Sequence, residues 1–202
     1  MSIAVGILST ITGHYRWAIW AGWFLATLGT GLLYLLDVNT TIPQWIFINI
    51  VSGLGTGMLF PSLAFGIQAP TPEEDQAPAV ALFTFLRTFG QAVGVALGGV
   101  IFQNSIQHKI ASHPVIAEHA SEWAAQSTEL VETIKSMAAG AAKDALIQSY
   151  SDALKPIWLF TCGLAAVGLI SSLFAKEFSL NREHDAKQAF NGGAASVDEE
   201  KK

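Results

Sequence analysis

Four long apolar segments, separated by polar connectors, dominate the pattern of the chain. They span residues 17–36, 45–67, 80–102 and 156–175. About 20 apolar residues in a helix cross the roughly 30 Å hydrocarbon core of a bilayer. The pattern therefore predicts an all-α, polytopic membrane helix bundle with about four transmembrane helices. Residues 1–12 are also apolar but too short to span, which indicates the tail of a preceding helix.

The segment between the third and fourth spans differs in kind, because residues 105–155 are polar. A narrow apolar stripe nevertheless recurs there at spacings of three and four: Ile116, Ala120, Trp123, Ser127, Leu130, Ile134 and Met137. Such spacing is typical of an amphipathic helix. We predict an extracellular loop whose amphipathic helices either lie on the membrane or cap the bundle. Residues 176–202 are charged and rich in Gly and Ala, which predicts a disordered cytosolic tail.

The placement of basic residues predicts the orientation. Arg16 precedes the first span and Lys176 follows the last, whereas the first two connectors contain no Lys or Arg. Short cytosolic flanks carry an excess of such cations. An even number of crossings then places both termini in the cytosol.

Composition narrows the function classes. Only 13% of the residues are charged, the net charge is −5 and the cations form no stripe, so nucleic acid is an unlikely partner. Cys162 is the single cysteine, which excludes an intramolecular disulfide, and the histidines lack the spacing of a metal site. We expect no metal, no cofactor and no enzymatic activity.

Arg87 is the one fully charged residue within the four predicted spans. Helical spacing places it on one face with Gln91, Gly94 and Gly98, while Phe85 lies on a side that suits lipid. A charge at membrane depth usually faces protein or a watery path. Two interpretations stay open: Arg87 lines a substrate path or pairs with an acidic group, or its long stem reaches the headgroups.

Further polar and small residues complete the candidate set. The substrate-path candidates are Asn49, Gln68, Arg87, Gln91 and Asn104, and the helix-packing candidates are Gly53, Gly57, Pro61, Gly90, Gly94 and Gly98. Glycines four residues apart let helices approach closely, and Pro61 should kink or unwind its span. No predicted span contains Asp or Glu, although proton-driven transport normally needs a titratable group within the membrane.

Three segments together resemble a known family. They read GHYRWAIWAGWFLATLGTGLLYLL (13–36), WIFINIVSGLGTGMLFPSLAFGIQA (45–69) and AVALFTFLRTFGQAVGVALGGVIFQN (79–104). Their order and their sequences resemble the C-terminal part of a major facilitator superfamily transporter, of the fungal fourteen-span drug:proton antiporter branch. The long loop and the last span with its tail are similar as well.

The resemblance implies an efflux transporter of the plasma membrane that exchanges drugs, toxins or secondary metabolites for protons. Its partners would be the lipid bilayer, a small amphipathic organic substrate, protons and the missing N-terminal half. The chain departs from the family by lacking about ten spans. We therefore expect it to be truncated and inactive alone.

Two alternatives belong to other classes. A self-sufficient four-span exporter acting as a dimer would need an acidic residue in its first span and very short loops, and this sequence has neither. A non-transporting four-span scaffold of the claudin or tetraspanin kind would use external disulfides, which the lone Cys162 cannot form.

Overall fold

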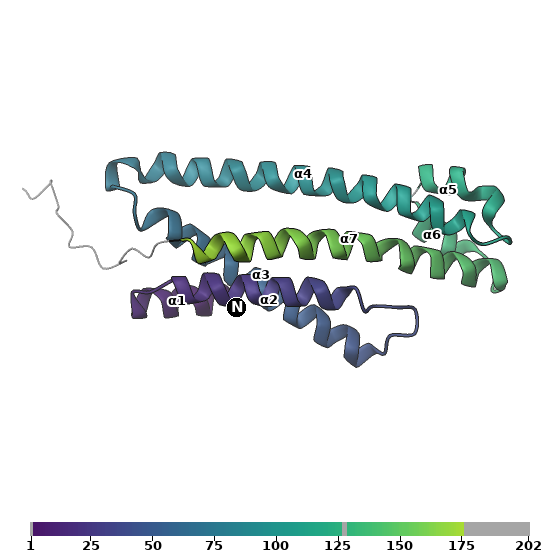
Figure 1. Cartoon of the computed structure of the whole chain (residues 1–202), viewed down its shortest axis with the longest axis horizontal. Coiled ribbons are helices and arrows are strands. Elements are labelled where there is room, and N and C mark those ends of the chain that lie inside the picture. Colours follow the sequence, from purple (N-terminus) through teal and green to yellow (C-terminus); the bar gives the residue numbers. More distant parts are fainter. Residues whose placement is uncertain (1, 127–128, 176–202) are drawn as a thin grey trace, which may run out of the picture.

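The computed structural model of the protein describes residues 2–126 and 129–175, and all regular elements in these ranges are helices (Figure 1). They are α1 (Ser2–Thr12), α2 (Arg16–Leu33), α3 (Ile42–Gln68), the 3-10 turn η1 (Glu73–Asp75), α4 (Gln76–Ala111), the 3-10 turn η2 (Ala117–His119), α5 (Ala120–Ala125), α6 (Leu130–Ser136) and α7 (Ala141–Leu173). The predicted all-α membrane helix bundle is confirmed. The predicted tail 176–202 and Ser127 lie outside the described residues.

Within residues 2–126 and 129–175, three helices are long and apolar enough to cross a membrane: α3, α4 together with the preceding η1, and α7. The remaining predicted span corresponds to α2, which has 18 residues and carries Arg16 at its first position. At 1.5 Å per residue α2 is about 27 Å long, slightly short of the hydrocarbon core. Its crossing of the membrane stays a prediction.

The long helices form an open arrangement. The helix α2 packs against α3 and against α7, and α7 packs in turn against α4, whereas α3 and α4 have little contact. Figure 1 shows α4, α7 and α2 side by side with α3 crossing behind them. One side of α4 is therefore left without a neighbouring helix in this part of the protein.

Glycines bring α2 and α3 together, at positions that the sequence analysis did not select. A Cβ added at Gly29 would lie 2.5 Å from the Cα of Ser52, and one at Gly55 would meet the backbone of Leu25 and Ala26. Contacts this close exclude any side chain. The crossing of α2 and α3 thus depends on Gly29 and Gly55.

Pro61 lies inside α3, and the helix continues through it from Ile42 to Gln68, without the local unwinding that we considered. Proline has no backbone N–H, so the carbonyl of Gly57, four residues earlier, loses its helical donor. The Ser2 hydroxyl donates to that carbonyl at 2.8 Å. Pro61 and Gly57 thereby create the point where α1 attaches to α3.

The helices α4 and α7 extend well beyond the predicted spans, into the segment that was predicted as a loop with amphipathic helices. The helix α4 continues to Ala111 and α7 begins at Ala141, so both ends of the segment 105–155 are helical. The reason is that Ile106 and Ile110 on α4 and Leu146 on α7 keep a helical spacing among polar residues, and all three are fully buried.

Residues 103–126 and 129–155 form what we call the polar lobe. The predicted stripe does not make one helix but runs over η2, α5 and α6. Its members Ile116, Ala120 and Leu130 join the extensions of α4 and α7 in one buried cluster, with Trp123 and Ile134 packed against it. The short helices thus cover the extensions of α4 and α7, and their position relative to the membrane stays a prediction.

Candidate functional site

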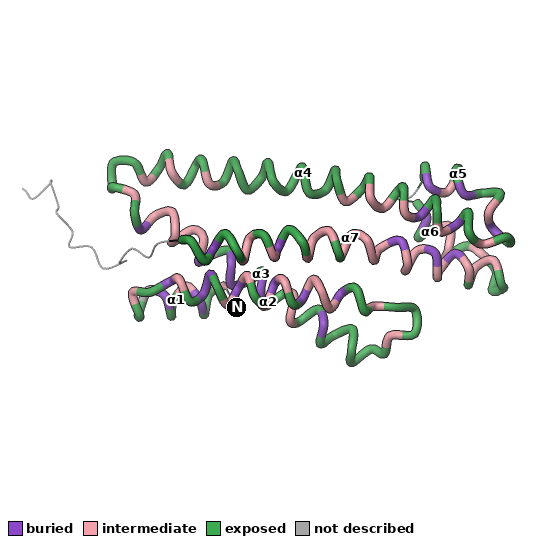
Figure 2. Tube along the Cα trace, in the orientation of Figure 1, coloured by how far each residue is buried: buried purple, intermediate pink, exposed green. Residues whose placement is uncertain are grey.

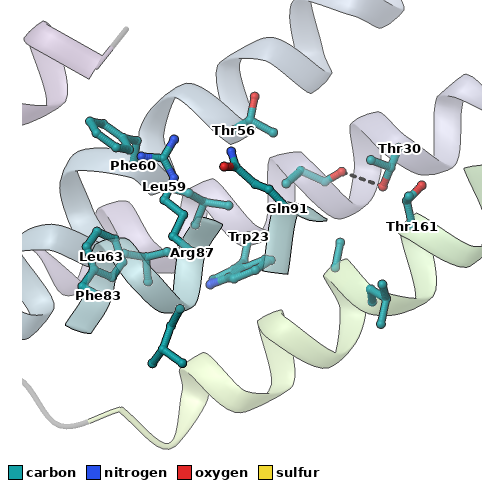
Figure 3. Close-up of a pocket in the computed structure, with 14 residues that line it drawn as sticks. Trp23, Thr30, Thr56, Leu59, Phe60, Leu63, Phe83, Arg87, Gln91 and Thr161 are labelled. Carbon is teal, nitrogen blue, oxygen red and sulfur yellow. Dashed lines mark hydrogen bonds between the residues drawn. The ribbon is translucent and has the colours of Figure 1, made fainter. Parts of the chain in front are cut away.

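A cleft of about 710 Å³ lies between α2, α3, α4 and α7. Nine of its fourteen lining residues are apolar, among them Trp23, Phe60 and Phe83. The polar ones are Thr30, Thr56, Arg87, Gln91 and Thr161 (Figure 3). The cleft is therefore an apolar, aromatic space with a few polar groups from four different helices.

Arg87 extends from α4 across this cleft toward α3 (Figure 3). Its guanidinium carbon lies 4.2 Å from the centre of the Phe60 ring. A cation over an aromatic face is stabilised by roughly 0.5–2 kcal/mol, more where water is excluded. This placement favours the interpretation in which Arg87 faces a path through the protein over the one in which it reaches the headgroups.

Gln91 lies one turn beyond Arg87 and also points into the cleft (Figure 3). Within the described residues, neither side chain has a hydrogen bond or an ion pair to another group of the chain. The threonine hydroxyls differ, since each donates to a carbonyl of its own helix: Thr30 to Ala26 at 2.8 Å, Thr56 to Ser52 at 3.1 Å and Thr161 to Ile157 at 3.0 Å. Arg87 and Gln91 therefore supply the free donors.

The other substrate-path candidates are not brought to the cleft. Asn49 and Asn104 are exposed and donate to carbonyls of their own helices, at 2.8 Å to Trp45 and 2.9 Å to Val100. Gln68 is half-buried at the end of α3 and does not line the cleft. Their part in transport stays a prediction.

The sequence analysis missed most of the wall. Trp23 lies in the middle of α2 rather than near a membrane interface, where tryptophans are usually enriched, and this was a usable signal. Threonines within apolar helices were a second signal. Nothing in the sequence indicated Phe60, because the register of α3 against α4 decides its place.

The helix-packing candidates fall into two groups. A Cβ at Gly53, Gly90, Gly94 or Gly98 would meet nothing within 4 Å in the described chain. Gly57 offers its carbonyl to α1, as described above. Beyond Gly29 and Gly55, Gly168 of α7 is also close-packed, since a Cβ there would lie 2.6 Å from the Trp23 ring.

Arg16 and Trp20 fasten the start of α2 to the end of α7. The Arg16 guanidinium donates to the Leu173 carbonyl at 3.4 Å and lies 4.4 Å from the centre of the Trp20 ring. The Trp20 indole N–H donates to the Ser172 carbonyl at 3.1 Å. A cation at a helix C-terminus is favourable because the last carbonyls lack helical donors. Both side chains thus have a structural explanation.

A small charge network lies outside the predicted spans, in the polar lobe. The Lys155 ammonium donates to Asp152 at 2.7 Å, and Lys109 of α4 lies 3.7 Å from the same carboxylate. The hydrogen bond from Lys155 lowers the pKa of Asp152, partial burial opposes this, and Lys109 adds to the lowering. The same bond raises the pKa of Lys155. The network ties α4 to α7 above the apolar segments.

Comparison with known proteins finds relatives that are all named transporters or efflux pumps. The chain is 48% identical over 200 residues to MFS transporter L2 of a Phoma species, which covers 99% of the chain and 33% of that protein. It is 33% identical over 192 residues to Efflux pump FUS6 of Gibberella fujikuroi, covering 90% of the chain and 33% of the pump. Over nearly its whole length the chain is similar to transporters of the major facilitator superfamily. The predicted resemblance to this family is confirmed.

The match covers only part of each relative. The chain spans about a third of the length of the curated relatives that it matches. MFS efflux transporter aclA of Aspergillus oryzae, 28% identical over 184 residues, is covered to the same extent, at 32%. No family profile and no solved structure matches the chain. The names of the relatives and the long apolar helices of the described residues indicate a multi-pass membrane protein, and the relatives are named transporters or efflux pumps.

Proposed function

We propose that this chain forms the C-terminal part of an efflux transporter for small amphipathic organic molecules, and that the cleft at Arg87 and Gln91 lines its path. The observation that carries the proposal is the cleft itself. A space of about 710 Å³ with apolar walls falls in the usual range of small-molecule sites. Its few polar groups come from α2, α3, α4 and α7, so movement of these helices would change the site. The names of the relatives, which include efflux pumps, support the direction of transport.

Proton coupling is part of the proposal, with the titratable group outside this chain. The apolar segments of α3, α4 and α7 contain no Asp or Glu in the described residues. Arginine stays charged throughout the physiological range and cannot bind and release the driving proton. The proton site therefore belongs to the remaining two thirds of the transporter. For the same reason, and because a major facilitator path forms between two halves, the 202 residues alone should transport nothing.

The proposed setting is the plasma membrane, with both termini in the cytosol and the polar lobe outside the cell. The basic flanks Arg16 and Lys176 support this orientation. We would place single cysteines at Ser121 and Ser196 in a Cys162→Ala background and treat intact cells with an impermeant thiol reagent. Labelling of Ser121→Cys alone is the expected result. Labelling of Ser196→Cys alone would show that the orientation is the opposite of the one proposed.

The transport experiment uses a chimera in which residues 1–202 replace the matching third of the Phoma relative. Both the chimera and the chain alone are expressed in a yeast strain lacking its own pumps, and efflux of several fluorescent organic compounds is measured with and without a proton gradient. We expect gradient-dependent efflux from the chimera and none from the chain alone. Efflux by the chain alone would instead support a self-sufficient exporter. A well-expressed chimera that fails where the intact relative pumps would contradict the proposal.

A further inference from the structure

Arg87 places a permanent positive charge in a cleft without a negative one. None of the lining residues is Asp or Glu. A charged side chain at membrane depth is costly, and a nearby opposite charge reduces that cost. The charge of Arg87 is thus unbalanced in the described part of the protein.

The contacts of Arg87 leave its hydrogen-bonding edge free. The guanidinium carbon of Arg87 lies over the Phe60 ring, 4.2 Å from its centre, and this contact uses none of the N–H groups as hydrogen-bond donors. The N–H groups at the edge have no acceptor within residues 2–126 and 129–175, and the Gln91 amide one turn away has none either. This contact holds the guanidinium beside Phe60 at the wall of the cleft and leaves its N–H groups available to a further acceptor.

From these observations we propose that Arg87 and Gln91 form half of a carboxylate-binding site, completed by a carboxylate from outside this chain. The inference rests on the proposed transport path. A planar carboxylate accepts two parallel N–H bonds from a guanidinium. The Gln91 amide, one turn along the same helix, adds N–H donors to the same cleft. Trp23 and Phe83 supply apolar walls for the organic part that carries the acid.

Charge balance selects a carboxylate over a phosphate or sulfate dianion. Arg87 is the single cation lining the cleft. A monoanion gives a neutral pair, whereas a dianion would leave a net negative charge among apolar side chains, which is costly. The carboxylate has two possible sources, the transported molecule or an Asp or Glu on a helix from the rest of the transporter. Both offer the same acceptor geometry to Arg87.

The test uses the chimera described above and two probes, a fluorescent monocarboxylic acid and its methyl ester. Binding is measured on purified protein in detergent and efflux in cells. If the substrate supplies the carboxylate, the acid should bind at least about tenfold more tightly than the ester, as expected for hydrogen bonds to a charged group. Arg87→Gln should abolish this preference, and Arg87→Lys should restore only part of it, because an ammonium lacks the fork. Gln91→Leu should reduce it less.

If another helix supplies the carboxylate, acid and ester behave alike and Arg87→Gln loses efflux of both. Neutralising one Asp or Glu in the rest of the transporter should then restore efflux in the Arg87→Gln background. Lys109→Gln, which removes a cation of the polar lobe, is the charge-matched control and should change neither the binding nor the efflux of either probe.

Two results separate this inference from the proposed function. Selective binding of the acid through Arg87 without any efflux would leave the carboxylate site standing and refute the proposed transport. An Arg87→Gln chimera that is present at normal abundance and handles both probes like the parent overturns the inference. Absence of both an acid preference and any Arg87-dependent efflux overturns it as well.

Discussion

The helix α4 is packed in opposite ways along its length. At the end that enters the polar lobe, Ile106 and Ile110 are fully buried. In its most apolar stretch no residue is buried, and Phe85 and Phe89 are 64% and 59% exposed. Figure 2 shows the change along one continuous helix, from a mostly exposed length to buried positions beside α5 and α6.

The contrast follows from the solvent on each side. In the polar lobe, apolar side chains would otherwise meet water, and burying each one contributes about 1.5–3 kcal/mol. Within the membrane segment, lipid tails are as apolar as the side chains, so there is no such drive for helices to associate. Apolar residues of α4 can therefore remain uncovered by this chain. Exposure there indicates a surface for lipid or for other helices of the transporter, and does not indicate a weak fold.

The largest effect should come from opening the buried cluster of the polar lobe. Leu146→Ala removes a fully buried side chain and should cost about 2–5 kcal/mol of stability. Leu159→Ala, on the same helix at a position 57% exposed, should cost less than about 0.5 kcal/mol. Thermal unfolding in detergent and protease resistance of residues 103–155 report both. Equal losses would mean that the two regions are not packed differently.

A smaller effect is expected where α2 and α3 are tightly packed. Gly55→Ala puts a Cβ against the backbone of Ala26, and overpacking of this kind costs about 1–3 kcal/mol. Gly53→Ala is the matched control, because nothing lies within 4 Å of the added atom. Alanine favours a helix over glycine by about 1 kcal/mol, so the control should be neutral or stabilising. The stability of each variant is measured by unfolding in detergent and compared with that of the parent. A loss of stability in Gly53→Ala equal to that in Gly55→Ala would contradict the prediction.

The third prediction concerns the glycines on the Arg87 face of α4, where an added Cβ at Gly94 would meet nothing within 4 Å in the described residues. In the chimera, Gly94→Leu should reduce efflux more than Val93→Leu, by roughly twofold to tenfold, because glycines at helical spacing permit close helix contact. In the isolated chain the two changes should be equivalent, since nothing lies near Gly94. Cell-surface abundance and efflux are measured together. Equal tolerance in the chimera would show that this face meets lipid rather than a helix.

The sequence predicted most of the membrane helices because long apolar runs leave few alternatives. It did not predict the extent of α4 and α7, since hydropathy falls after residue 102 although the helical spacing of Ile106 and Ile110 continues. It identified the stripe that builds the lobe, which the structure divides among η2, α5 and α6. The spacing of residues along a helix predicts which of them share a face. Which faces of different helices meet is determined by packing.

The candidate site divides in the same way. Arg87 and Gln91 are four residues apart on one helix, so their shared face followed from the sequence. Phe60 and Trp23 belong to other helices, and their approach to Arg87 depends on crossings that Gly29 and Gly55 permit. No periodicity within one span encodes such crossings. The predicted glycines of α4 illustrate this, because they lie on the correct helix and meet nothing in the described chain.

The smallest effect should come from the charge network between α4 and α7. Because hydrogen bonding to Lys155 lowers the pKa of Asp152 below its usual 3.8, the ionised carboxylate is favoured in the folded protein. Its contribution is therefore fully present above about pH 4 and is lost as the pH falls through the lowered pKa. For a partly exposed pair this amounts to about 0.2–1 kcal/mol. Asp152→Asn should be less stable than the parent at pH 7 by that amount, and the difference should shrink below pH 4.

Glu132→Gln, which breaks the exposed pair with Lys135, controls for loss of a surface carboxylate. Protease resistance of residues 103–155 between pH 7 and pH 3 measures the difference, and a gap that widens in acid would contradict the assignment.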